Sequence, residues 1–321
     1  MPTNVVHPDA GLARDLLASG LVDTHYHVGP EVIPRRYDLV GLAAHVGRAT
    51  VVLKNHSYAT TPLAALGRAH YNVALLGGIV LNHFVGGLNP YAVEAAASAN
   101  RTFANGPPAC EPPMVVWMPT VHARSHLETF GYEFDPRWFG EESPAGATTR
   151  GRLPTPVDVF DQDGRPVPQL FDLLEAVAAA GARLATGHLS AHEVVRIVPI
   201  ALDAGVPAVL ITHPSYPSVG LSDDELVTLT RDRRVFVEHC LAVHTIEGLP
   251  LERFAASIKA TGPEQVIVAS DFGQVVSESF PHATLRYASR LAELLGDRVR
   301  GDAFLALFGQ NGRRALGLDR Q

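Results

Sequence analysis

The sequence predicts an α/β protein, a single (β/α)8 barrel (TIM barrel) over residues 1–321, with an inserted loop or hairpin after the fourth strand and helices near the C-terminus. Short β-branched or apolar runs alternate with Ala/Leu-rich stretches of helical period, which indicates parallel βαβ units. Eight such runs favour a closed barrel over an open sheet. No G-x-G-x-x-G follows the first run, which counts against a dinucleotide-binding fold.

The eight units follow one another along the chain. Each strand run is apolar or β-branched and ends in polar residues, whereas each helical stretch has apolar residues at intervals of three and four. The strands are expected at residues 21–27, 50–56, 74–84, 114–123, 182–190, 207–215, 234–240 and 265–274. The helices after the first seven strands are expected at residues 38–49, 62–71, 91–100, 170–181, 191–205, 222–232 and 251–262.

Composition and charge restrict the class of protein. With 46% apolar and 18% charged residues in 321, the chain has ample core and is not disordered. The net charge of −7 and the lack of a Lys/Arg-rich run argue against a nucleic-acid partner. No apolar segment approaches the ~18 residues of a membrane helix, and the start lacks signal-peptide features. Cys110 and Cys240 have no C-x-x-C spacing, so a cytoplasmic protein with reduced cysteines is expected.

Residues able to bind metals or move protons gather at the ends of the predicted strands. In such barrels this end is the functional face, because each strand passes there into its βα loop. A single histidine there is more often structural than a ligand, but several at matching depth reverse those odds. In chain order, these residues are His25, His27, Lys54, Asn55, His56, His83, Thr120, His122, His188, His213, Glu238, His239 and Asp271.

The first strand, LVDTHYH, places two histidines one residue apart. Side chains alternate along a strand, so Asp23, His25 and His27 are expected to point one way and Thr24 and Tyr26 the other. Two imidazoles would then converge on one point, which suits a divalent metal. A His-x-His pair alone is weak support, and the remaining ligands must come from other strands.

Four short motifs carry a family resemblance: DTHYH on the first strand, TGHLS on the fifth, ITHPS on the sixth and ASDFG on the eighth. The series resembles the amidohydrolase superfamily of metal-dependent barrel hydrolases over nearly the whole chain. The tail NGRRALGLD is similar to the Asn-Pro-Ala-x-x-Leu-Gly-Leu ending of that superfamily, with Gly312 replacing the proline. With VLKNHSYAT and VVWMPTVHA added, the combination looks most like a bacterial group of amidohydrolase-like proteins without an assigned reaction.

The resemblance implies a divalent metal cofactor, zinc or a similar ion, in one or two copies. It makes His25, His27 and Asp271 ligands of one metal, and His188 and His213 ligands of a second. In two-metal members a carboxylated lysine on the fourth strand bridges the ions. This chain departs from that pattern, because its fourth strand, MVVWMPTVHA, contains no lysine.

Lys54 is the available substitute for that lysine. It shares one face of the second strand with Val52 and His56, and the chain has very few lysines. Burial lowers the pKa of a lysine and favours the neutral amine that reacts with carbon dioxide, so N-carboxylation of Lys54 is one interpretation. The other is an ammonium group paired with Asp23, Glu238 or a substrate carboxylate, and both interpretations stay open.

Five further residues are candidates for contacting substrate or orienting ligands: His56, His83, His122, His126 and Glu238. At least two of these four histidines are expected to lie behind the ligands or on the surface rather than in contact with metal or substrate. On the seventh strand, Glu238 is expected to face the barrel interior, because Val235, Val237 and His239 share the opposite face.

The spacing of strand ends predicts an insertion over about 124–169. This stretch is rich in Pro, Gly and aromatic residues (Phe130, Tyr132, Phe134, Trp138 and Phe139), and Asp163-Gly164 indicates a hairpin turn between short strands. Long loops on the functional face of a barrel form lids or substrate pockets, which is the preferred interpretation. A contact between subunits is the alternative, and a homo-oligomer is expected.

The ligand set predicts hydrolysis of an amide, cyclic amide or lactone of a small molecule by metal-activated water, with Asp271 as the catalytic proton shuttle. A purine-type deaminase is disfavoured, because Leu189 and Ser190 follow His188 where the resemblance would require an acidic residue. Two alternatives stay open: a single-metal decarboxylase of an aromatic or unsaturated acid, and a non-catalytic metal-binding barrel.

Overall fold

The structure, a computed structural model, describes residues 9–100, 111–142 and 152–319, so Cys110 and part of the predicted insertion lie outside the described residues. The strands are β1 (Val22–His27), β2 (Thr50–Lys54), β3 (Ala74–Leu76), β4 (Gly78–Val80), β5 (Val115–Trp117), β6 (Arg183–Ala185), β7 (Val209–Thr212), β8 (Val235–Cys240) and β9 (Val266–Ala269). The α-helices are α1 (Ala10–Ser19), α2 (Leu39–Ala43), α3 (Thr61–Tyr71), α4 (Pro90–Ala99), α5 (Arg124–Phe130), α6 (Pro168–Ala179), α7 (Ala191–Asp203), α8 (Asp223–Leu229), α9 (Leu241–Thr245), α10 (Leu251–Thr261), α11 (His282–Leu295), α12 (Asp302–Ala306) and α13 (Gln310–Leu316). The 3₁₀ helices are η1 (His83–Val85), η2 (Pro136–Glu142) and η3 (Gly296–Arg298).

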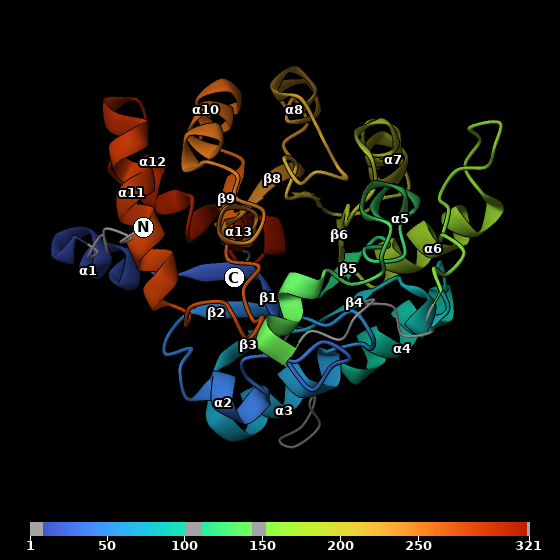
Figure 1. Cartoon of the computed structure of the whole chain (residues 1–321), viewed down its shortest axis with the longest axis horizontal. Coiled ribbons are helices and arrows are strands. Elements are labelled where there is room, and N and C mark those ends of the chain that lie inside the picture. Colours follow the sequence, from blue (N-terminus) through green and yellow to red (C-terminus); the bar gives the residue numbers. More distant parts are fainter. Residues whose placement is uncertain (1–8, 101–110, 143–151, 320–321) are drawn as a thin grey trace.

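The strands form two parallel sheets that together make a ring. One sheet has the order β1-β2-β3 and the other the order β4-β5-β6-β7-β8-β9. The segments β3 and β4 are the two halves of the third barrel strand, pairing with β2 and β5 respectively. A parallel bridge between Tyr26 and Phe272 joins the first strand to the end of the last. Helices surround these strands (Figure 1), and the predicted (β/α)8 fold is confirmed, including the C-terminal helices α11 to α13.

The third strand is interrupted because two glycines allow close contacts on both sides. A Cβ atom on Gly77 would lie 2.4 Å from the Thr61 Cα, and one on Gly78 would lie 2.3 Å from the Val115 carbonyl oxygen. The Thr60 N–H donates to the Gly78 carbonyl at 2.8 Å. The single strand predicted over 74–84 is therefore two short strands followed by η1.

The lower half of the barrel interior is apolar. Trp117 lies at the top of this layer, where its ring centroid is 5.8 Å from that of His25. A second and larger apolar layer separates the strands from the surrounding helices. Above Trp117 the interior becomes polar, and the candidate site begins. The interior apolar cluster comprises Val22, Val52, Leu76, Val80, Val115, Trp117, Ala185, Ala208, Leu210, Phe236, Ile267, Ala315 and Leu316.

The helices begin where the sequence supplies capping groups. Ser190 and Ser222 form capping boxes with Glu193 and Glu225, each serine accepting from the N–H three residues on. These caps start α7 and α8 directly after the loops that carry the strand-end residues. None of the helices in the described ranges is both long enough and apolar enough to cross a membrane.

Candidate metal centre

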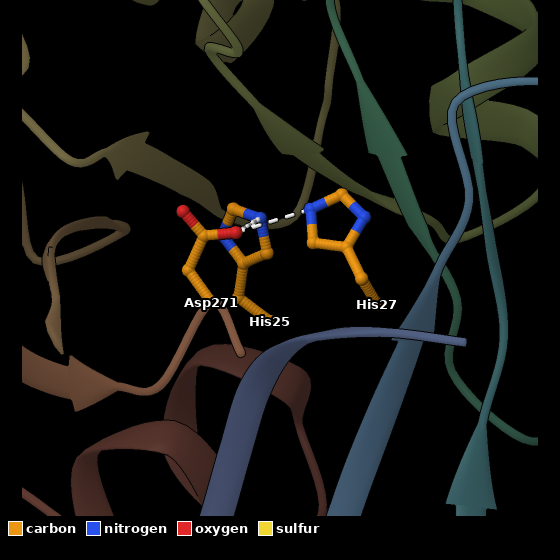
Figure 2. Close-up of side chains that lie close together, drawn as sticks. All are labelled: His25, His27 and Asp271. Carbon is orange, nitrogen blue, oxygen red and sulfur yellow. Dashed lines mark ion pairs between the residues drawn. The ribbon is translucent and has the colours of Figure 1, made fainter. Parts of the chain in front are cut away.

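Three side chains meet at the mouth of the barrel, where β1 and the loop after β9 lie side by side. The Oδ1 atom of Asp271 lies 3.0 Å from Nε2 of His25 and 3.0 Å from Nε2 of His27 (Figure 2). Ligand atoms of the three residues lie within 4.8 Å of one another, close enough to share one ion. Imidazole and carboxylate groups are ligands of zinc and similar ions. Asp271 has a φ of 53°, a conformation that Asp and Asn tolerate better than most residues.

A bulge in β1 sets the directions of its side chains. The pairing of β1 with β2 shifts by one residue between Asp23 and Tyr26, so strict alternation is lost. Thr24 and His25 consequently both bond to the Glu238 carboxylate. The prediction that Thr24 points away from the face of His25 is wrong, because the bulge adds one residue between paired positions.

Glu238 holds His25 in the tautomer that a metal requires. Glu238 Oε2 lies 3.0 Å from His25 Nδ1, and although burial opposes ionisation, the neighbouring His25 lowers the pKa of Glu238. An ionised carboxylate only accepts, so Nδ1 carries the proton and Nε2 faces Asp271. Burial lowers the pKa of His25, but Asp271 and Glu238 outweigh burial and the pKa is raised. A cation at Nε2, either a proton or a metal ion, is therefore favoured.

Lys54 lies among these side chains and is buried. Its Nζ atom is 2.9 Å from His25 Nε2 and 5.5 Å from the centre of the Trp117 ring. Burial lowers the pKa of Lys54. In the described part of the chain, Lys54 forms no ion pair with Asp23 or Glu238, so these two acids are not the partners that an ammonium interpretation requires.

A relay of hydrogen bonds fixes the tautomer of His188. His126 Nε2 lies 3.2 Å from the Glu133 carbonyl oxygen and must donate to it. Burial lowers the pKa of His126 to about 4, so the ring is neutral near pH 7 and its Nδ1 accepts. His188 Nδ1, 2.9 Å away, is then the donor. The Nε2 atom of His188 is left with a lone pair.

His213 follows β7 with a φ of 27°. Its ring centroid lies 4.9 Å from that of His188, and burial lowers the pKa of His213 to about 3. Its Nδ1 is buried and has no hydrogen-bond partner among residues 9–100, 111–142 and 152–319. A buried polar atom without a partner is costly, so this neutral imidazole fits a residue that binds an ion.

A cavity brings most of the predicted site residues together: His27, Lys54, His56, His188, His213 and Asp271 line it. His25 and Glu238 lie directly beneath, and His126 lies behind His188. The cavity lining does not include His83 or His122. His83 Nε2 contacts the Thr155 carbonyl, and His122 bonds to Glu133, so both hold the insertion instead.

The insertion contributes to the wall of the cavity. Trp138 of η2 lines it and stacks on His56 at 6.0 Å between ring centroids. Phe134, Trp138 and Phe139 are buried in a small apolar cluster with Ile33. The predicted turn at Asp163-Gly164 is present, but one antiparallel bridge, Phe160 to Pro166, replaces the expected pair of short strands.

Sequence reasoning missed four polar residues of the cavity: Arg35, Tyr216, Glu247 and Gln274. Arg35 lies in a loop without periodicity, so no pattern marks it, and Gln274 closed the eighth predicted strand without being recognised as a site residue. Tyr216 follows the strand-six histidine by three residues, and the Pro-Ser between them was the only local signal. Its buried hydroxyl has no hydrogen-bond partner in the described residues, which leaves it available to a ligand.

Comparison with known families assigns the chain to one of them. Residues 20–238 match the model of a family of unknown function, DUF6282. The chain belongs to this family. The matched region of DUF6282 includes His25, His27, Lys54, His188, His213 and Glu238, and ends before Asp271. None of the curated proteins matches the chain.

Solved structures share the fold of this DUF6282 protein. An amidohydrolase from Pseudomonas aeruginosa is 12% identical with a TM-score of 0.56, covering 96% of this chain and 99% of its own. N-acetyl-D-glucosamine-6-phosphate deacetylase from Mycobacterium smegmatis is 15% identical with a TM-score of 0.55, and the match covers 93% of this chain and 76% of the deacetylase. The probable dipeptidase PvdM from Pseudomonas aeruginosa is 13% identical with a TM-score of 0.51, and the match covers 96% of this chain and 98% of the dipeptidase. The resemblance to the amidohydrolase superfamily is confirmed for the fold.

Proposed function

We propose that the protein is a metal-dependent hydrolase that attacks the carbonyl of an amide, cyclic amide or lactone with an activated water. The observation that carries this proposal is the state of two ring nitrogens at the barrel mouth. Glu238 and His126 hold protons on Nδ1 of His25 and His188, so Nε2 is the atom that each ring can offer to a metal; on His25, the metal would replace the proton that faces Asp271. A histidine binds a metal only through an unprotonated nitrogen.

Two sets of residues would hold the metal. His25, His27 and Asp271 form the first, and His188 and His213 form the second. Zinc suits a donor set of imidazoles and a carboxylate. A bound ion of this kind supplies hydroxide near neutral pH by lowering the pKa of its water from about 15.7 towards about 7.

Asp271 is proposed as the proton shuttle. Its side chain is 15% exposed, so it reaches the cavity, whereas His25 beneath it is fully buried. Burial raises the pKa of Asp271, but His25 and His27 outweigh burial and hold it well below its usual range. The carboxylate is therefore ionised, which is the state in which it can take a proton from the attacking water and return it to the leaving nitrogen or oxygen.

Lys54 is proposed to be N-carboxylated in the two-metal form. Three observations support this: Lys54 contacts His25 and lines the same cavity as His188 and His213, its pKa is lowered, and it forms no ion pair with Asp23 or Glu238 in the described part of the chain. The lysine nitrogen would attack carbon dioxide and lose a proton, forming a carbamate. That group would supply the anion that His188 and His213 lack.

A single-metal decarboxylase is the second candidate. The observation that favours it is that only the first set of ligands contains a carboxylate, so one strong site can exist without the other. A non-catalytic barrel is the third. The number of bound ions distinguishes these candidates from a two-metal hydrolase.

The insertion is proposed to act as a lid over a small-molecule site. Trp138 packs on His56 at the cavity wall, and Arg137 joins Asp135 to Glu247 of the loop after α9. These contacts link the insertion to the opposite side of the cavity. Opening of such a loop would admit substrate, and closing would exclude water.

The deciding experiment is elemental analysis of protein that has never been exposed to a chelator. We expect about one to two equivalents of zinc or a similar ion per chain. The variant His213→Ala should retain about one equivalent. The variant His45→Ala, which changes an exposed turn residue, should match the wild type. Less than one equivalent in wild type, without gain on reconstitution, would refute the proposal. Turnover of lactones and cyclic amides, compared with aromatic carboxylic acids, then separates hydrolase from decarboxylase.

A further inference from the structure

Arg35 lies in the loop after β1 and lines the cavity. Its backbone forms an antiparallel bridge with Gln274, and the next residue, Arg36, donates its N–H to the Gly273 carbonyl at 2.8 Å. These bonds join the loop to the segment that carries Asp271. The guanidinium is thus positioned by backbone contacts beside the candidate metal centre.

The Arg35 side chain is 1% exposed and forms an ion pair with Glu31, whose side chain is fully buried. Glu31 receives the Arg35 Nε–H on Oε2 and the His56 N–H on Oε1. A buried ion pair adds little stability over apolar residues of similar size, because desolvation offsets the attraction. Stability alone therefore does not account for a guanidinium at this place.

One edge of the guanidinium is held by Glu31, and the other edge faces the site. Nη2 lies 2.9 Å from Nδ1 of His27, and Nη1 has no hydrogen bond to any described residue. An arginine has five N–H donors in a planar fork, and its two Nη atoms match the two oxygens of a carboxylate. This edge is therefore used for a single contact here.

The contact with His27 conflicts with metal binding. Arg35 can only donate, so His27 Nδ1 accepts and its proton lies on Nε2, towards Asp271 Oδ1 at 3.0 Å. To bind an ion through Nε2, His27 must carry its proton on Nδ1. Two donors would then face each other, and Arg35 Nη2 would have to leave His27. Ligation by His27 thus frees both Nη atoms of Arg35.

We propose that Arg35 is a specificity residue that binds a carboxylate group of the substrate, next to the bond that is cleaved. The inference rests on the proposed metal-dependent function and names its substrate class. A carboxylate fits better than a phosphate because the cavity offers little positive charge. Among its described lining residues, the basic side chains are Arg35 and Lys54, and the acidic side chains of Glu247 and Asp271 offset them. One planar anion with a single charge matches one free guanidinium edge.

The test uses three probes on zinc-loaded protein, with affinity measured by calorimetry: butyrohydroxamate, succinate monohydroxamate and 3-phosphonopropionohydroxamate. The hydroxamate group of each is directed at the metal, and the probes differ in the far end of the chain. We expect the carboxylate to improve wild-type affinity about 10- to 100-fold over the neutral probe, as for hydrogen bonds to charged groups. The phosphonate should bind no better than the carboxylate.

Two variants remove the recognition. Arg35→Met combined with Glu31→Gln avoids an unpaired buried carboxylate, and Arg35→Lys keeps a cation for Glu31 but lacks the planar fork. Both should lose most of the carboxylate gain while binding butyrohydroxamate as the wild type does. Arg36→Met is the matched control, since Arg36 is exposed, bonds to the Ser277 carbonyl and is not part of the cavity lining.

The outcomes separate the two levels of the proposal. If butyrohydroxamate does not bind wild-type protein, the metal site itself is refuted. If it binds, but the carboxylate gives no gain or the gain survives in Arg35→Lys and the double variant, the role of Arg35 is overturned. A larger Arg35-dependent gain for the phosphonate would replace carboxylate by phosphate as the substrate group.

Discussion

The two halves of the candidate metal centre differ in charge. His25 and His27 share the Asp271 carboxylate (Figure 2). A second carboxylate, that of Glu238, contacts the other ring nitrogen of His25. Within the described ranges, no carboxylate pairs with His188 or His213 in this way; His188 is supported by a neutral imidazole, and the pKa of His213 is lowered by burial. The first half, with His25, His27 and Asp271, can neutralise a divalent ion alone. The second half, with His188 and His213, needs an anion from elsewhere. The tests below ask how far this asymmetry controls binding and catalysis.

The largest effect is expected from Asp271→Asn. Asn tolerates the φ of 53° at this position and keeps one oxygen for a metal, but it cannot accept a proton at neutral pH. Activity should fall by about 10² to 10⁴ while most of the metal and the melting temperature are kept. Turnover on the substrate found by screening and metal analysis measure both.

The control for this variant is Asp297→Asn, which changes an exposed acid paired with Arg300. Near-full turnover by Asp271→Asn would shift the role of base to another residue of the first half. Loss of the fold in Asp271→Asn alone would instead indicate a structural Asp.

Removing Lys54 should separate the halves. In Lys54→Ala the second half loses its proposed anion, so bound zinc should fall from about two equivalents to about one. Added formate or propionate should restore the second equivalent of zinc. Lys259→Ala is the matched control, since Lys259 donates to the Leu294 carbonyl far from the cavity. Two equivalents in Lys54→Ala without added acid would show that the second half binds without this lysine.

A smaller effect is expected from Glu238→Gln. The substitution keeps the shape of the side chain but removes the charge that holds the Nδ1 proton of His25. Zinc affinity of the first half should fall about 10- to 100-fold, the usual effect of changing a group that orients a metal-binding histidine. Competition with a fluorescent chelator measures it, and Glu128→Gln, at an exposed ion pair, should change nothing. Unchanged affinity would mean that Asp271 and the imidazoles alone decide the strength of this half.

The smallest effect is expected from His126→Phe. It removes the acceptor that fixes the His188 tautomer, but that acceptor is neutral, so zinc affinity of the second half should fall only about 10-fold. The first half should bind as before, which the same competition assay resolves. His83→Phe, at a histidine outside the cavity lining, is the comparison variant. A loss at both halves would show that the relay from Glu133 supports the whole centre.

The barrel and most of the cluster could be predicted because they depend on local patterns. Strand and helix periods repeat along the chain, and the barrel rule places strand-end histidines on one face. The alternation of side chains along the seventh strand also predicted that Glu238 points to the interior, where it bonds to His25. The bulge in β1 could not be predicted, because an extra residue in one strand depends on its pairing with β2.

Other features depend on tertiary packing and left no local signal. The contact between His126 and His188 joins the insertion to the fifth barrel strand. Arg35 and Glu31 lie four residues apart in a loop where no sequence pattern indicates burial, whereas the structure buries both side chains. Whether a charged loop residue is buried depends on what covers the loop, here β2 and the segment after β9.

The seam that joins the first and last barrel strands also has a consequence for biosynthesis. The Asp271 N–H donates to the His25 carbonyl at 2.8 Å, and the His27 N–H donates to the Phe272 carbonyl at 2.8 Å. Gly273 packs so closely that a Cβ atom there would lie 2.0 Å from the His27 carbonyl oxygen. A nascent chain therefore carries the two histidines of β1 without their acidic partner until the last strand has been made and docked. Tight metal binding would begin only when the barrel is complete. The ion would then stabilise the folded barrel and would not nucleate its folding.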